Sequence, residues 1–135
     1  MIFRKSPKHP LPKFPSRTIP TFENLCFPLP LDQVNELKLK VDDALRALVE
    51  RARYEINIDL AMARQVVHSC HVLLDEYGTR TEKERALIVG AVRYFAIADD
   101  PLPDGTFATG LDDDAKIVNH VLEQLGIEES YIYIP

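Results

Sequence analysis

The chain has 135 residues, 46% hydrophobic and 27% charged, which suits one globular domain and is too short for two of ordinary size. Its formal net charge of −5 is unevenly placed, because residues 1–22 carry five basic side chains and no acidic one. The acidic remainder disfavours nonspecific binding to nucleic acid or to anionic lipid.

Neither a secretory signal nor a membrane-spanning segment is expected. The apolar start Met1-Ile2-Phe3 is too short for a signal sequence, and the longest apolar run, residues 86–92, is too short to cross a bilayer. Two cysteines are too few for a disulfide framework. We therefore expect a cytoplasmic protein.

The first 30 residues hold seven of the ten prolines and are predicted to form a basic arm, separate from a helical domain over residues 31–135. Proline disfavours a regular helix and favours extended structure. Two alternatives stay open, a free tail or an arm anchored on the body or on a partner. The apolar residues available as anchors are Phe14, Phe22, Leu25 and Phe27.

Two helices are predicted in the first half of the domain, from apolar residues that recur on one face. The first runs from residue 31 or 32 to about residue 54. Asn57 or Asp59 caps the second, which runs to Tyr77 and is followed by Gly78. A glycine in this place commonly closes a helix in a left-handed conformation.

Two more helices are predicted in the second half. Thr81 and Glu84 form a capping box that opens a helix to about Ala98. Apolar residues cover most of its circumference, which is typical of a central helix, and Phe95 is expected to be buried. The last helix runs from residue 111 or 112 to Leu125, with Gly126 after it. The predicted fold is all-α, about four helices packed as a small bundle with a proline-rich extended N-terminal arm.

An acidic stretch joins the last two predicted helices, with six aspartates between Asp99 and Asp114. Oxygen ligands from such a loop are what Mg²⁺ or Ca²⁺ requires, although the EF-hand spacing is missing. The alternative is structural: Asp112 would be the N-cap of the last helix, and other aspartates would bind loop N–H groups. The candidate metal ligands are Asp100, Asp104, Asp113 and Asp114.

The same stretch resembles the signature of the YkvA-like bacterial family, roughly Tyr, then Asp-x-x-Pro-Asp, then Gly-x-x-Asp-Asp-Ala. The resemblance implies a small helical domain of unknown function. The sequence departs from the family at residues 105–109, where the family is usually rich in apolar residues, and at Asp99. The matching positions are Tyr94, Asp100, Pro103, Asp104, Gly110, Asp113, Asp114 and Ala115, and Asp112 lies among them as the predicted cap.

The histidines suggest no strong metal site. His68 and His71 are three residues apart on a predicted helix, but they share a polar stripe that is typical of a solvated face. On that stripe His71 and Asp75 are predicted to pair. His120 is expected to be exposed on the outer face of the last helix.

No phosphate-binding loop, zinc-ligand spacing or Ser-His-Asp order is present. We therefore predict a non-enzymatic protein-interaction or regulatory module that binds a protein partner or itself and does not bind nucleic acid. No catalytic residue is nominated, and no cofactor is expected other than a divalent cation. The alternative is a metal-dependent hydrolase or transferase, with Mg²⁺ or Ca²⁺ held by the aspartate-rich loop.

Overall fold

The computed structural model describes residues 7–97 and 110–135, and the predictions for Asp99, Asp100, Pro103 and Asp104 lie outside these ranges. The described residues form five α-helices and no strand, which confirms the all-α prediction. The helices are α1 (Thr18–Leu25), α2 (Val34–Arg51), α3 (Leu60–Glu76), α4 (Glu82–Ile97) and α5 (Gly110–Leu125), and three 3₁₀ turns span Leu31–Gln33, Tyr77–Thr79 and Glu128–Ser130.

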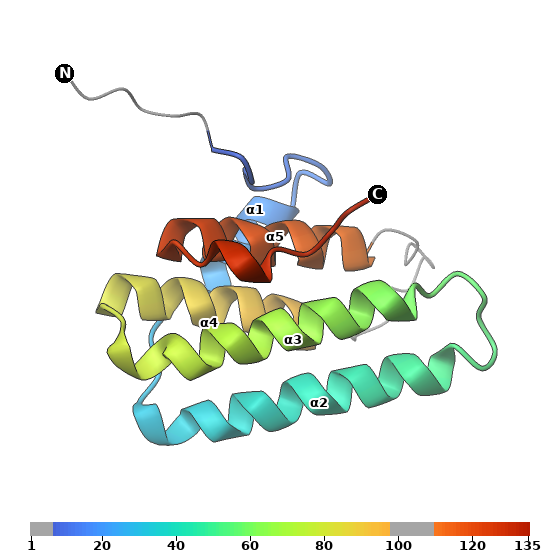
Figure 1. Ribbon diagram of the computed structural model, residues 1–135, viewed down its shortest axis with the longest axis horizontal. Helices are drawn as coiled ribbons and strands as arrows, with labels where there is room; N and C mark the ends of the chain where they lie inside the picture. Colours follow the sequence, from blue (N-terminus) through green and yellow to red (C-terminus); the bar gives the residue numbers. More distant parts are fainter. Residues whose placement is uncertain (1–6, 98–109) are drawn as a thin grey trace.

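Helices α2 to α5 pack side by side, and successive helices run in opposite directions (Figure 1). Helix α1 lies behind α4 and α5 in this view. Helix α4 contacts all four of the other helices, so the helix that the sequence predicts to be central is central. Its position explains why its apolar residues are not confined to one face.

Three of the predicted helix ends have the hydrogen bonds or backbone conformation that the sequence indicates. Asp59 accepts a hydrogen bond from the Met62 N–H at 3.0 Å and so caps α3. At the start of α4 the Glu84 N–H donates to the Thr81 hydroxyl, and the Thr81 N–H donates to the Glu84 carboxylate, which is the predicted capping box. Gly126 closes α5 in the left-handed region at φ 75°.

Gly78 does not have the predicted left-handed conformation, because Gly126 is the only described glycine with a positive φ. The chain instead leaves α3 through a 3₁₀ turn that begins at Tyr77. The buried Tyr77 hydroxyl accepts a hydrogen bond from the Leu29 N–H and donates one to the Leu29 C=O. These contacts hold the segment before α2 against the end of α3.

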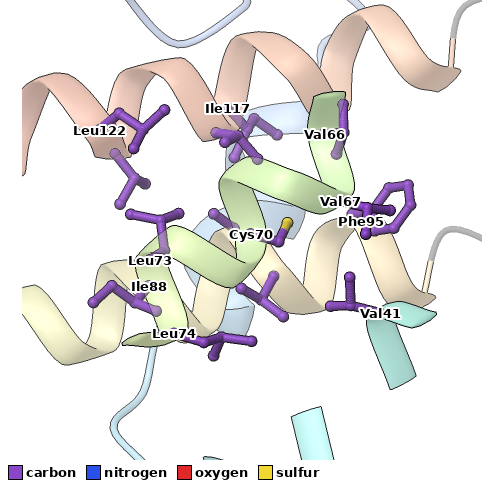
Figure 2. Close-up of a cluster of buried hydrophobic side chains, with 14 of the residues drawn as sticks. Val41, Val66, Val67, Cys70, Leu73, Leu74, Ile88, Phe95, Ile117 and Leu122 are labelled. Atoms are coloured by element: carbon purple, nitrogen blue, oxygen red, sulfur yellow. The ribbon is translucent and has the colours of Figure 1, made fainter. Parts of the chain in front are cut away.

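A single hydrophobic core runs between all five helices. Figure 2 shows side chains of α3, α4 and α5 filling the space between their ribbons, among them Leu73, Ile88 and Leu122. Phe95 is only 4% exposed, as predicted, and Cys70 is fully buried.

Helix α1 was not predicted, because the sequence analysis expected extended structure throughout the proline-rich segment. Pro20 is the third residue of the helix, where the missing N–H costs little because N–H groups of the first turn have no partner within a helix. The side chain of Phe22 is 2% exposed and belongs to the core. Residues before residue 31 therefore share the hydrophobic core of the predicted helical domain.

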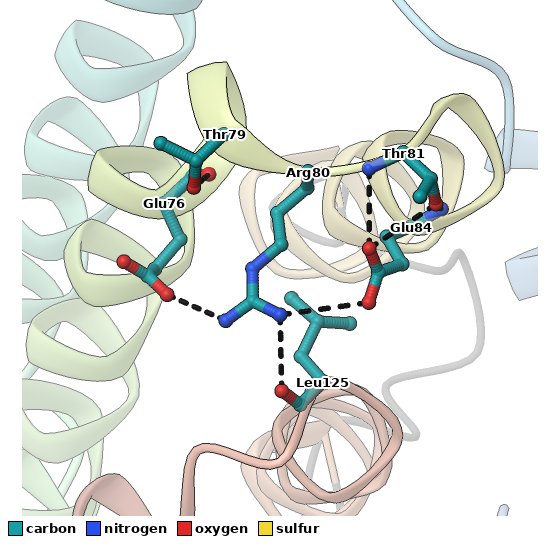
Figure 3. Close-up of polar contacts among 6 residues, drawn as sticks. All are labelled: Glu76, Thr79, Arg80, Thr81, Glu84 and Leu125. Carbon is teal, nitrogen blue, oxygen red and sulfur yellow. Dashed lines mark hydrogen bonds and ion pairs between the residues drawn. The ribbon is translucent and has the colours of Figure 1, made fainter.

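Arg80 joins the ends of three helices (Figure 3). Its guanidinium forms ion pairs with Glu76 at the end of α3 and with Glu84 at the start of α4. It also donates a hydrogen bond of 3.1 Å to the C=O of Leu125, the last residue of α5. A cation at this place complements the negative end of the α5 dipole.

The segment around residues 8–12 lies against α5. The backbone N–H groups of Lys8 and His9 donate to the Glu123 carboxylate at 2.8 and 2.9 Å. The His9 ring packs on Tyr131, with ring centroids 4.2 Å apart. His120 was predicted to be exposed but is half-buried. Its Nδ1 donates a hydrogen bond to the His9 C=O at 3.0 Å.

Replacing Phe95 by alanine is expected to destabilise the protein by roughly 3–5 kcal/mol, because it removes a buried ring from the core and leaves a cavity. Phe14→Ala is the matched control, since the Phe14 side chain is 82% exposed, and should change stability by less than about 0.5 kcal/mol. Urea denaturation measures both. Equal losses in the two variants would contradict the central position of α4.

Gly90 allows α1 to lie against α4. A Cβ atom at this position would clash with the Cys26 Sγ and would lie 3.0 Å from Cε1 of Phe22. Gly90→Ala should therefore destabilise by about 1–3 kcal/mol, although alanine favours a helix over glycine by about 1 kcal/mol. Gly78→Ala is the control, because its Cβ would meet no atom closer than 3.8 Å.

Urea denaturation of Gly90→Ala, alone and combined with Cys26→Ala, measures this clash. The double variant should recover part of the loss, since it removes the sulfur atom that obstructs the new methyl group. A Gly90→Ala protein more stable than wild type would rule out this packing of α1.

Candidate functional site

The described residues of the YkvA-like signature lie near the end of α4 and at the start of α5. Tyr94 lies on α4, and Gly110 is the first residue of α5. Asp112, Asp113 and Asp114 follow on α5, whereas Asp100, Pro103 and Asp104 belong to the residues that are not described. Two of the four candidate metal ligands, Asp113 and Asp114, therefore lie among the described residues.

Asp112 is not the N-cap of α5, because the helix begins two residues earlier, at Gly110. Its side chain is exposed. A carboxylate in the first turn still interacts favourably with the positive end of the helix dipole. The helix and its acidic start were predicted from the sequence, but the helix begins one or two residues earlier than predicted.

Asp113 and Asp114 are both buried, with 9% and 4% of their surface exposed. Burial raises the pKa of Asp114 well above its usual value, and the neighbouring charge of Asp113 raises it further. The pKa of Asp113 is also raised, mainly by burial, although Lys116 opposes the rise. Among the described residues, Oδ1 of Asp114 has no hydrogen-bond partner.

Tyr94 connects this pair to α1. Burial raises the pKa of its hydroxyl, and the charges of Asp113 and Asp114 add to the rise. A hydrogen-bonding interaction with the side chain of Thr18, the first residue of α1, lowers the pKa of Tyr94, as does the charge of Arg17. The Thr18 side chain is itself buried, with only 1% of the residue's surface exposed.

Thr18 is the member of this group that the sequence analysis missed. It lies in the proline-rich segment, four residues before Phe22, and only the packing of α1 on α4 brings it to Tyr94. The resemblance to the YkvA-like signature did single out Tyr94, Asp113 and Asp114. No pattern in the sequence joins Thr18 to them.

The histidines of α3 form no metal site. His68 is exposed, and His71 Nε2 lies 2.8 Å from Oδ1 of Asp42 on α2. The predicted pairing of His71 with Asp75 is wrong, because Asp75 pairs with Lys38 on α2. Both side chains find partners across the α2–α3 interface. Within residues 7–97 and 110–135, no three side chains of the His, Cys, Asp and Glu types are grouped to hold a metal ion.

The chain matches no family model, curated protein or solved structure. Among the described helices, none is both long and apolar enough to cross a lipid bilayer.

Asp114→Asn should increase the stability of the protein at pH 7 more than at pH 4. The folded-state pKa of Asp114 is raised above its unfolded value of about 3.9. The contribution of the protonated carboxyl to the free energy of unfolding is therefore complete below the unfolded-state pKa. It is lost as the pH rises through the folded-state pKa. Asparagine cannot ionise, so it avoids this loss.

Urea denaturation at the two pH values, with a chelator present, measures the effect. Asp112→Asn is the matched control, because it removes a carboxylate from the same helix, two residues away, at an exposed position. A gain for Asp114→Asn that is no larger at pH 7 than at pH 4 would contradict the raised pKa.

Proposed function

We propose that this protein is a non-enzymatic interaction module of the YkvA-like type, located in the cytoplasm. Its partner is another protein or a second copy of the chain. The observation that supports the proposal is an apolar tip, formed by Tyr54 and Ile56 in the turn between α2 and α3. Their side chains are 81% and 99% exposed.

The tip is presented on an ordered turn. The N–H groups of Tyr54 and Glu55 both donate to the C=O of Arg51, each at 3.0 Å, which continues the hydrogen bonding of α2 into the turn. At the other side of the turn, Asp59 caps α3. A backbone held in place by such bonds loses little further conformational freedom on binding, which favours affinity.

Charged residues surround the apolar tip. Arg51 pairs with Glu55, and Arg53 pairs with Glu50. Protein interfaces commonly have an apolar or aromatic centre with a polar rim, and tyrosine is enriched among the residues that dominate binding energy. Isolated exposed apolar residues such as Leu39 on α2 are ordinary, whereas two at one turn form a local anchor.

The experiment compares wild type with the double variant Tyr54→Ser/Ile56→Ser, using Leu39→Ser as the matched control because its side chain is 62% exposed. Both variants should keep the stability of the wild type to within about 0.5 kcal/mol, since they change exposed residues. Sedimentation equilibrium measures self-association, and affinity capture with each protein as bait measures binding to other proteins.

We expect association to weaken in the double variant and to persist in Leu39→Ser. Weaker self-association would identify a second copy as the partner, and loss of particular captured proteins would identify another chain. A wild-type protein that is monomeric at every concentration, with the same captured proteins as the double variant, would overturn the proposal.

A further inference from the structure

Residues 8–12, which we call the docked segment, are bound to α5 through their backbone. The N–H groups of Lys8 and His9 donate to the two oxygens of the Glu123 carboxylate, and the His9 C=O accepts a hydrogen bond from the His120 ring. A segment outside regular secondary structure needs such partners for its backbone groups. These bonds therefore define a specific binding position on α5.

Side chains of the docked segment add apolar contacts. The His9 ring packs on Tyr131 near the end of the chain. Leu11 packs against the hydrophobic core, and Pro12 is buried. These polar and apolar contacts come from five consecutive residues, so the docked segment can detach and bind again as a unit.

Residues 13–17 connect the docked segment to α1, and each of them is exposed. Helix α1 is held separately, since Phe22 is 2% exposed and belongs to the core. The docked segment can therefore leave its position while α1 stays on α4. Five residues in an extended, proline-containing conformation span about 15 Å, which is enough to reach a neighbouring copy at the surface.

The connection carries a large aromatic side chain that the single chain leaves in water. Phe14 is 82% exposed. When two copies exchange identical segments about a two-fold axis, their two connections meet at that axis. The two Phe14 rings can then pack on each other, which is a contact that the single chain cannot make.

We propose that the protein forms a two-fold symmetric dimer in which the docked segment of each copy binds Glu123, His120 and Tyr131 of the other copy. Each contact of the docked segment is the same in the single chain and in the dimer, so the exchange itself changes the free energy little. The burial of Phe14 is the net gain, and the loss of free movement on association opposes it.

Charge also opposes this dimer where the connections meet. Lys13 and Arg17 lie on either side of Phe14 in the sequence, and each approaches its counterpart in the second copy. The contacts of the docked segment with α5, in contrast, are the same before and after exchange. We therefore expect the dimer to strengthen as salt rises from about 0.05 M to about 0.5 M, because salt screens the repulsion. A dimer that weakens over this range would be held by charge attraction and would overturn the proposal.

Crosslinking between copies tests which copy the docked segment binds. His9→Cys and Tyr131→Cys are made in separate full-length chains that also carry Cys26→Ala, and the two are mixed at high concentration and treated with a short bismaleimide. The His9 and Tyr131 rings are 4.2 Å apart, so exchange brings the new thiols within reach of the reagent. The His9→Cys change keeps the backbone hydrogen bonds to α5, and Cys70 is fully buried.

We expect a crosslinked dimer from this mixture. The control is a mixture of His9→Cys with Leu39→Cys, because Leu39 is 62% exposed on α2, which lies on the opposite side of the bundle from the docked segment (Figure 1). A mixture that gives no more crosslinked dimer than this control would overturn the proposal. The double variant Tyr54→Ser/Ile56→Ser should leave the crosslink unchanged, which separates this proposal from the one based on the apolar tip.

Sedimentation equilibrium measures the contribution of Phe14. Phe14→Ser should raise the dissociation constant of the dimer at least about tenfold, since it removes the contact that only the dimer makes. Tyr133→Ser is the matched control, because Tyr133 is an aromatic residue with 75% of its surface exposed, and it should dimerise like the wild type. A wild type that is monomeric at every concentration, or equal dissociation constants for the two variants, would overturn the proposal.

Discussion

The structure depends on covering helix α4 on every side. Ile88, Val89 and Val92 are completely buried; Ile88 and Val92 share one face of the helix, and Val89 points about 100° away from Ile88. Burial of such side chains is worth about 1.5–3 kcal/mol each, so α4 is stable in water only when its neighbours enclose it. The close approach of α1 requires the absence of a side chain at Gly90, where the helix backbone meets Phe22.

Enclosing α4 also buries polar groups, some of which have hydrogen-bond partners. The amide of Asn119 exchanges two hydrogen bonds with the backbone of Ile132, and the Tyr77 hydroxyl does the same with Leu29. These groups hold the C-terminal segment and the α1–α2 connection on the bundle. Oδ1 of Asp114 is equally buried but lacks such a partner among the described residues.

Part of the candidate site could be predicted from the sequence, because the resemblance to a known signature drew attention to Tyr94 and Asp113. The pattern could not separate Asp112, which is exposed, from its two buried neighbours. Three consecutive helical residues point in directions about 100° apart, so their surroundings depend on which helices pack around α5. No local pattern could predict the contribution of α1, since a proline-rich composition favours extended structure.

The sequence by itself determined the features that arise from interactions between residues close in the chain. Asp59 caps α3, and Gly126 closes α5, because both signals act within a few residues. The tertiary structure alone decided which partner each polar side chain meets. His71 pairs with Asp42 on α2 rather than within its own helix, and Thr18 approaches α4, since the gain from burying apolar surface positions the helices. Polar groups then bond to whatever that packing brings within reach, and a local sequence pattern carries no information about it.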